Sequence, residues 1–213
     1  MALFQRRPQI SEAKQFYTIG LNKTLLIVGL GNPGAEYAQS RHNIGFEVID
    51  AFAKTNDFPN WTLKKELRAE LTKTTINDVP TILIKPSTFM NLSGQAVQAT
   101  ASFYKIPPSQ ITVIHDELDI HFGTIRTRVG GASAGHNGVK SIIEQLGEDF
   151  GRIRIGIGPK QPADTDSADF VLKKFSKAEL GHLPALLRET NAILSEFIFS
   201  NGTLSNDTRD FLL

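Results

Sequence analysis

The sequence predicts a single α/β domain whose mixed, mostly parallel twisted sheet is flanked by helices. Short apolar runs that fit buried strands alternate along the chain with longer segments in which apolar residues recur at helical spacing. Two neighbouring strand-like segments, residues 66–75 and 80–85, are separated only by the turn at Asn77-Asp78, which predicts a hairpin and therefore an antiparallel part of the sheet. The 213 residues, 40% of them hydrophobic, suffice for one compact core.

Composition excludes several functional classes. The chain has no cysteine, which excludes thiolate catalysis, disulfides and cysteine-bound metal and is typical of a reducing compartment such as the cytoplasm. Its net charge is only +1, so a surface for a polyanion has to be a local patch. No apolar run approaches the ~18 residues of a membrane span. Residues 1–22 lack the apolar core of a secretory signal, and we expect a poorly ordered N-terminal extension followed by one domain over residues 23–213.

The first half of the chain predicts three strands and two helices. A continuous apolar run fits a buried strand, whereas alternating apolar and charged residues fit a strand with one exposed face. Apolar residues three and four apart fit amphipathic helices, and a proline pair ends the second helix because proline cannot continue it. Strands are expected over residues 24–28, 66–75 and 80–85, and helices over residues 45–54 and from Leu92 to the residue before Pro107-Pro108.

The second half predicts three more strands and three more helices. Alternation places Arg126 and Arg128 on one face of a strand and gives a later strand a basic face. The long helix near the C-terminus contains Pro184, which either kinks it or belongs to its first turn. Strands are expected over residues 111–114, 123–129 and 152–157, helices over residues 139–146 and 177–199, a polar loop over residues 159–169, and a short last helix after Asn201.

The stretch LLIVGLGNPGAEYAQSRHN, from Leu25 to Asn43, joins the first strand to the first helix. Ligands of open α/β sheets bind at the carboxyl ends of strands, so we expect the active site here. GLGNPG fits the G-x-G-x-x-G pattern of dinucleotide-binding loops. Two features oppose a nicotinamide-dependent oxidoreductase: residues 35–42 lack helical apolar spacing, and Glu47 and Asp50 fall inside the helix rather than at the end of a second strand.

Histidine and carboxylate side chains occur at two further points. His42 directly precedes the first helix, and an imidazole there can act as a general base if its other nitrogen donates to a carboxylate. HDELD, which contains Asp116, follows a buried strand, where a charge needs a partner. Asp116 is the most economical partner for His42. The alternatives are a solvated acidic loop, or a metal bound by His115, Asp116 and His136, for which the spacing gives no support.

Three asparagines are expected where loops enter helices. Asn32 and Asn91 lie in such loops, and Asn137 follows the glycine-rich residues 130–135, which we call the glycine loop. A carboxamide both donates and accepts hydrogen bonds, so three of them converging on one cleft suit a peptide or nucleotide ligand. The structural alternative is that these residues cap helices beside a mobile loop.

A single concentration of basic residues can be assembled from the predicted strands. If the strands are adjacent, alternate side chains form a stripe that can contact nucleic-acid phosphates. The alternative is that they belong to ordinary solvated strand faces. The residues concerned are Arg126, Arg128, Arg152, Arg154 and Lys160.

Together these motifs resemble those of the bacterial-type peptidyl-tRNA hydrolases. The shared elements, in order between Leu25 and Phe199, are GLGNPG with a following Tyr and RHN, KPxTFMNLSG, HDELD, GG with GHNG, and RIRIGIG. The resemblance implies a monomeric, cytoplasmic α/β esterase that needs no metal or other cofactor. Its substrate would be peptidyl-tRNA, held by the acceptor stem and CCA end. The enzyme would cleave the ester between a peptide, or an N-blocked amino acid, and the 3′ ribose, and so recycle tRNA for translation.

The resemblance also implies a role for individual residues. His42 would be the catalytic base and Asp116 its partner, while Asn32 would hold the peptide or stabilise a developing oxyanion. The sequence departs from the family pattern at residues 132–134, where a more glycine-rich loop is common, and at residues 120–122, where a proline-rich turn is common. The positions that match substrate- or tRNA-binding residues are Tyr37, Asn43, Phe89, Met90, Asn91, His136, Asn137, Arg128, Arg154 and Lys160.

The implied reaction is attack on the ester carbonyl by a water molecule that His42 deprotonates. One open alternative is that the neighbouring ribose 2′-hydroxyl takes part. Another is a non-catalytic RNA-binding protein of the same fold. The presence of a complete set of candidate residues favours the hydrolase; that set is His42, Asp116, Asn32, Asn91 and Asn137.

Overall fold

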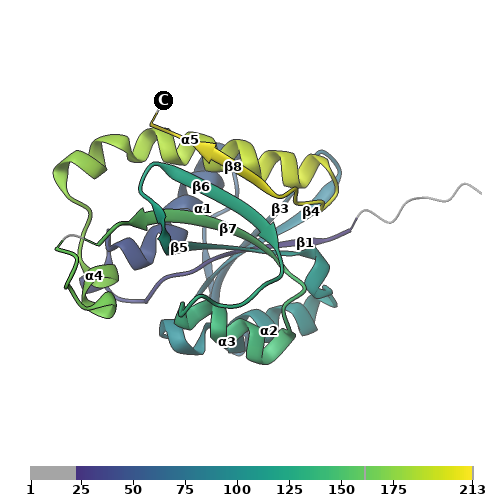
Figure 1. Ribbon diagram of the computed structural model, residues 1–213. Helices are drawn as coiled ribbons and strands as arrows, with labels where there is room; N and C mark the ends of the chain where they lie inside the picture. The colour runs from purple at the N-terminus through teal and green to yellow at the C-terminus, as the bar shows by residue number, and fades with distance from the viewer. Residues whose placement is uncertain (1–22, 161, 213) are drawn as a thin grey trace, which may run out of the picture.

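A computed structural model describes residues 23–160 and 162–212, arranged as one eight-stranded sheet between two helical layers (Figure 1). The sheet order is β2-β3-β4-β1-β5-β7-β6-β8. The strands are β1 Leu25–Gly29, β2 Thr62–Lys64, β3 Ala69–Ile76, β4 Val79–Pro86, β5 Ile111–His121, β6 Thr124–Val129, β7 Gly151–Gly158 and β8 Asp207–Asp210. The helices are α1 Ile44–Thr55, α2 Ser93–Tyr104, α3 Asn137–Leu146, α4 Ser167–Leu172 and α5 Lys177–Phe199.

The expected α/β fold with a mixed sheet is confirmed. β1 pairs in parallel with β4 and β5, and β5 pairs in parallel with β7. Toward each edge of the sheet the strands pair in antiparallel fashion: β2, β3 and β4 at one edge, and β7, β6 and β8 at the other. The parallel character therefore holds for the four central strands. Their carboxyl ends meet at one edge of the sheet, where a ligand site is expected in this architecture.

Apolar side chains on the two faces of the central strands build two cores. Leu25 and Ile27 pack in the core beneath α1 and α5, whereas Leu26 and Val28 pack in the core above α2 and α3. A strand buried on both faces has a continuous apolar run, which is the pattern seen in β1. Gly45 allows α1 to approach the sheet closely, because a Cβ there would lie 2.5 Å from the backbone nitrogen of Leu30. This contact brings the 3₁₀ turn Arg41–Asn43 to the carboxyl edge.

Several sequence-based expectations about the elements are wrong. β5 does not end at residue 114, because its pairing with β7 continues through Glu117 and, after an irregularity, His121. The HDELD motif therefore lies inside a strand rather than in a loop. The tail after Asn201 forms β8 beside β6 instead of a helix. Residues 167–169, placed in a polar loop, form the first part of α4, and β3 begins at Ala69, after β2 and a 3₁₀ turn.

Other expectations hold or fall outside the described residues. The hairpin is present as β3 and β4, and Pro184 lies within α5, which the capping box of Ser176 and Glu179 begins. No helix in the described ranges is long and apolar enough to span a membrane. The N-terminal extension predicted over residues 1–22 lies outside the described residues.

Candidate active site

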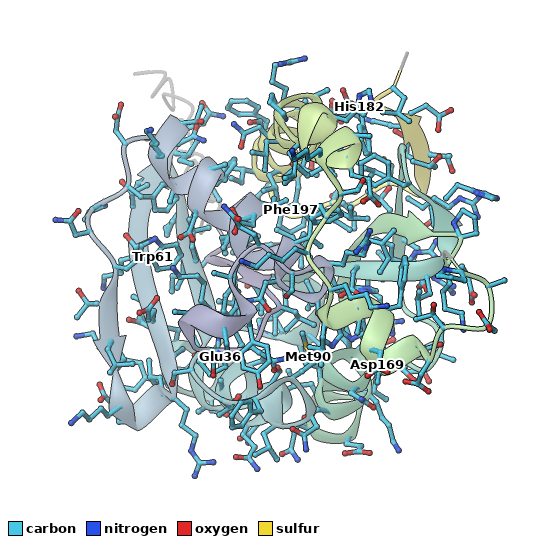
Figure 2. The ribbon with its side chains drawn as sticks, turned by 90° about the vertical axis from the view of Figure 1, so that its left-hand side faces the viewer. Glu36, Trp61, Met90, Asp169, His182 and Phe197 are labelled. Carbon is cyan, nitrogen blue, oxygen red and sulfur yellow. The ribbon has the colours of Figure 1, made fainter. Side chains whose placement is uncertain are left out.

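A pocket of about 680 Å³ opens at the carboxyl edge of the central strands. Figure 2 looks onto this edge and labels Met90 and Asp169; Met90 lines the pocket, and α4, the helix that contains Asp169, forms one wall. The volume falls within the usual range of ligand sites. Eight residues that the sequence marked as site candidates line the pocket: Asn32, His42, Phe89, Met90, Asn91, Asp116, His136 and Asn137.

Two histidines share one buried carboxylate at the floor of the pocket. His42 Nδ1 lies 2.9 Å from Asp116 Oδ1, and His136 Nε2 lies 3.0 Å from the same oxygen. Asp116 is only 2% exposed and His42 8%. The position of His42 follows from the 3₁₀ turn before α1, that of Asp116 from β5, and that of His136 from the residue preceding α3. Three separate elements therefore converge on one oxygen atom.

The start of α3 determines which nitrogen of His136 carries a proton. The backbone N–H groups of Gly138 and Val139 donate to His136 Nδ1, at 3.1 and 3.3 Å. Nδ1 is therefore an acceptor, and Nε2 carries the proton that it donates to Asp116. Ionised Asp116 only accepts, so His42 donates from Nδ1. In its neutral form His42 then has an unprotonated Nε2 available on the pocket side.

Electrostatics keep Asp116 ionised. Burial of the carboxyl by itself raises its pKa, but the two imidazoles outweigh burial and hold the pKa below its ordinary value. His115, one residue earlier, donates from Nδ1 to the backbone oxygen of Asp116 at 2.7 Å. Burial, followed by repulsion from His136, lowers the pKa of His115 to about 3, so this ring is neutral. At the neighbouring Glu117, burial raises the pKa.

Asn32 has a fixed orientation above this centre. Its backbone N–H donates to Asn43 Oδ1 and its backbone oxygen accepts from Asn43 Nδ2, both at 2.9 Å. Its side-chain Oδ1 accepts from the backbone N–H of Met90 at 2.8 Å. Because Oδ1 is engaged, the Nδ2 amide is the part of the side chain left to donate to a ligand. Asn43, which does not itself line the pocket, thus acts by holding Asn32.

Other predicted site residues lie at the pocket mouth or away from it. Phe89 is 54% exposed, and Tyr37 packs against it with 6.3 Å between ring centroids, so Tyr37 supports the rim without lining the pocket. Asn91 and Asn137 are exposed and line the pocket from the 3₁₀ turn Met90–Leu92 and the first residue of α3. Lys160 is tied into the loop before α4, because its Nζ donates to Thr165 O at 3.0 Å and Ser167 Oγ at 3.2 Å.

The α4 wall was missed by the sequence analysis. Val171 and Leu172 of this short helix line the pocket together with its first residues. A local signal existed: Asp166 is an N-cap residue whose side chain accepts from the backbone N–H of Ala168. Polar residues before it masked the apolar positions, and residues 159–169 were therefore assigned to a loop.

Arg41 fastens this wall to the turn that carries His42. Its guanidinium donates to Lys174 O at 2.7 Å and to both carboxylate oxygens of Glu179, and it stacks over the Phe170 ring at 4.5 Å. An arginine can serve this junction because its planar fork binds a carboxylate and main-chain oxygens at the same time. Sequence reasoning did not single out Arg41 as more than part of the RHN motif.

The arginines of β6 and β7 form a separate basic hollow. Its lining includes Arg126, Arg128 and Arg154, together with Asn206 and with Thr208 of β8. The expectation that β7 has an ordinary basic face is wrong at Arg152, which is 2% exposed. Main-chain oxygens of the glycine loop replace water around this guanidinium, as its bond of 2.7 Å to Ala132 O shows. We call Arg126, Arg128, Arg152 and Arg154 the arginine patch.

The described residues contain one group with the geometry of metal ligands. It consists of His42, Asp116 and His136, whose ligand atoms lie within 4.8 Å of one another. The hydrogen bonds that Asp116 accepts account for this proximity, and an ion would have to replace both protons. His115 does not belong to the group, so the alternative ligand set His115, Asp116 and His136 is not assembled.

A histidine with a buried carboxylate partner, next to an oriented amide donor, is typical of hydrolases. A model of the peptidyl-tRNA hydrolase family matches residues 26–211. Peptidyl-tRNA hydrolase of Mycobacteroides abscessus is 44% identical over 179 residues, which are 84% of this chain and 90% of that protein. The enzyme named as chloroplastic from Arabidopsis thaliana is 47% identical over 72% of this chain and 53% of that protein.

A solved structure gives the same result. Peptidyl-tRNA hydrolase from Acinetobacter baumannii matches with a TM-score of 0.71 and 35% identity, covering 83% of this chain and 87% of that one. The chain belongs to the peptidyl-tRNA hydrolase family. The expected enzyme class, a hydrolase of peptidyl-tRNA that serves translation, is thereby confirmed.

Proposed function

We propose that His42, oriented by Asp116, is the general base in the hydrolysis of peptidyl-tRNA. The observation that carries this proposal is the hydrogen bond of 2.9 Å between His42 Nδ1 and Asp116 Oδ1, which leaves Nε2 free to take a proton. His42 removes a proton from a water molecule, whose oxygen attacks the carbonyl carbon of the ester. The carbon–oxygen bond to the 3′ ribose then breaks, and the proton passes from His42 to the departing 3′ oxygen.

Asn32 is positioned to assist at the carbonyl. The Asn32 Nδ2 amide donates to the peptide or to the developing oxyanion, and its orientation is set in advance by Met90 and Asn43. A donor fixed before the reaction stabilises charge without a reorganisation cost. Asn91 and Asn137, together with Phe89, Met90 and His136, surround the remaining substrate in the pocket. No step requires a metal or another cofactor.

The acceptor stem and CCA end of the tRNA form the other half of the substrate. Arg128 and Arg154 of the arginine patch contact its phosphates, while Lys160 has a weaker case because the loop before α4 uses its ammonium. The catalytic domain comprises residues 23–213, acts as a monomer and works where translation takes place, in the cytoplasm; residues 1–22 precede it as an extension. The chloroplastic relative shows that related proteins also occur in organelles.

The test is the release of N-acetyl-amino acid from N-acetyl-aminoacyl-tRNA by the wild type and by His42→Ala, with and without EDTA. Release by the wild type that is lost in the variant and indifferent to EDTA is the expected result. Release blocked by EDTA would instead assign His42, Asp116 and His136 to a metal. Binding of tRNA without release by the wild type would favour the RNA-binding alternative.

A further inference from the structure

Arg152 connects the arginine patch to the glycine loop. Its guanidinium is almost fully buried and stacks on Phe150, with 4.8 Å from Cζ to the ring centroid. Nη1 donates to Ala132 O at 2.7 Å and Nη2 donates to Gly131 O. Both acceptors belong to the main chain of the glycine loop, which leads directly into His136. The position of His136 therefore depends on a loop whose main chain is bound by Arg152.

The same arginine belongs to one of two opposed pairs of like charges on β6 and β7. In the β6–β7 register, Arg128 lies directly opposite Arg152, and Arg126 lies directly opposite Arg154. Like charges at opposed positions of antiparallel strands repel each other. Burial, followed by repulsion from Arg128, lowers the pKa of Arg152 to about 10. The neighbouring guanidinium groups of the patch therefore repel the guanidinium of Arg152.

No carboxylate relieves this repulsion within salt-bridge distance in the part of the chain that the structure describes. Over residues 23–160 and 162–212, no hydrogen bond or ion pair engages the guanidinium groups of Arg126, Arg128 and Arg154. Glu117 and Glu148 act on the patch only from a distance. Asp207, which also lines the hollow, is paired with Arg209 at 2.8 Å. None of the described residues therefore neutralises these guanidinium groups at close range, and a bound anion would do so.

The glycine loop also contacts the exposed part of the patch. Gly131 has φ of +95°, and a Cβ added there would collide with the guanidinium of Arg128. Arg128 thus lies against the residue whose carbonyl oxygen Arg152 holds. A change in the charge or position of Arg128 acts on the loop from one side and on Arg152 from the other.

We propose that Arg152 is a positioning residue that couples the binding of an RNA phosphate at Arg128 and Arg154 to the glycine loop, and through the loop to His136. A bound phosphate neutralises the charges that oppose Arg152, which strengthens its two bonds to the loop and fixes His136 against Asp116. The catalytic centre is then completed by the stem of the substrate, which lies outside the pocket. This inference rests on the proposed function and goes beyond it by linking its two sites.

The test separates the two parts of the substrate. N-acetyl-aminoacyl-adenosine carries the ester but no phosphate, and a 5′-phosphorylated RNA hairpin without an unpaired 3′ end supplies phosphates without filling the pocket. Hydrolysis of the first is measured while the second is added at constant ionic strength. Amide hydrogen exchange of residues 130–138 is followed in parallel. The proteins are the wild type, Arg152→Lys, which keeps the charge but loses the fork that spans two carbonyl oxygens, and Arg188→Lys, which makes the same replacement at an exposed position of α5 outside the patch.

Saturating hairpin is expected to accelerate the wild type and Arg188→Lys roughly fivefold or more, the lower end of typical coupling between sites. It should also slow their loop exchange. Arg152→Lys should bind the hairpin with similar affinity but show neither response. Equal acceleration in Arg152→Lys and the wild type would overturn the proposal. Bound hairpin without acceleration or protection in the wild type would also overturn it, and this arm does not depend on a variant that folds.

Two outcomes separate this proposal from the proposed function. If the wild type hydrolyses N-acetyl-aminoacyl-tRNA and His42→Ala does not, the catalytic assignment stands even when the hairpin has no effect, and only the coupling fails. If the hairpin does not bind to the wild type, the phosphate role of the patch and the coupling fail together.

Discussion

The catalytic centre and the arginine patch treat charge in opposite ways. At the centre, the one carboxylate accepts from two imidazoles at 2.9 and 3.0 Å, and one of those imidazoles is itself held by two backbone N–H groups. In the patch, four arginines lie in opposed pairs, and only the buried Arg152 has hydrogen-bond partners among the described residues, both of them neutral carbonyl oxygens.

This difference in charge pairing fits two different tasks, catalysis at the centre and recognition of a polyanion at the patch. The geometry of a general base must be in place before substrate arrives, so its partners are part of the protein. A polyanion is recognised by cations whose partner is the ligand itself, and unpaired arginines are suited to that task. Changes at the centre should therefore reduce turnover at any salt concentration, whereas changes in the patch should act on affinity in a salt-dependent way.

The largest expected effect is that of Asp116→Asn. The amide cannot stabilise the imidazolium that forms when His42 takes a proton, and it no longer demands a donor from His42 Nδ1. In other His–Asp systems the same change lowers kcat about 10⁴-fold. Single-turnover hydrolysis of N-acetyl-aminoacyl-tRNA measures it. Asp119→Asn, an exposed carboxylate on the same strand, is the matched control and should behave as the wild type. A small loss in Asp116→Asn would remove Asp116 from the mechanism.

A smaller loss is expected for Asn32→Asp. The carboxylate still accepts from the backbone N–H of Met90, so the loop is kept, but the amide that faces the substrate is gone. Removing one such donor typically costs about 10²–10³ in kcat. The control is Asn60→Asp, which adds the same charge at an exposed position. If KM rises while kcat is unchanged, Asn32 holds the ground-state substrate and does not act at the oxyanion.

The sequence predicted the elements around the centre better than the patch. Those elements are indicated by patterns of neighbouring residues, whereas the patch depends on contacts between distant parts of the chain. β1 and α5 could be recognised because a doubly buried strand has a continuous apolar run and because apolar residues recur along α5 at helical spacing. The pairing of His42 with Asp116 was predicted as the most economical choice of partner, although Asp116 lies inside β5 and not after its end. The exact path of β5 was not predicted, because the strand extends through HDELD only by pairing with β7, about 40 residues later.

The patch depended on contacts that no local pattern contains. Arg152 alternates with apolar residues like any solvated strand residue, and its burial follows from the carbonyl oxygens of Gly131 and Ala132, about 20 residues earlier in the chain. β8 has four polar residues and becomes a strand only beside β6, where Thr127 Oγ1 accepts from the backbone N–H of Asp207. Pairing with β6 at the edge of the sheet therefore makes β8 a strand, although its residues have little intrinsic strand propensity.

The patch itself is tested by Arg128→Ala combined with Arg154→Ala. Binding of tRNA to the double variant should weaken, and the slope of log Kd against log salt should fall by about one to two, since each neutralised phosphate contributes nearly one. Lys177→Ala with Arg188→Ala removes two exposed charges from α5 and serves as the control with equal net charge. An unchanged salt slope in the patch variant would contradict the phosphate role, whatever happens to kcat.

The smallest effect concerns stability and isolates a buried group beside the centre. The pKa of His115 is lowered to about 3 by burial, whereas an unfolded histidine titrates near 6.5. Below pH 6.5 the unfolded chain therefore binds a proton that the folded protein does not, so the free energy of unfolding falls as the pH falls. The contribution lost between pH 6.5 and 5 is about 2 kcal/mol. His115→Asn keeps a donor for the Asp116 backbone oxygen but removes this titration.

Urea unfolding at pH 7 and pH 5 should consequently show a smaller decrease for His115→Asn than for the wild type. His182→Asn, an exposed histidine on α5 (Figure 2), should retain the wild-type decrease. Asp116 does not confuse the comparison, because its lowered pKa makes its contribution decline only as the pH falls below about 4, outside this window. Equal pH dependence in the wild type and His115→Asn would mean that His115 becomes protonated in the folded state. In that case a protonated His115 would lie beside His136 and compete with it for Asp116. The centre would then contain a cation without a carboxylate partner of its own, as the arginine patch does.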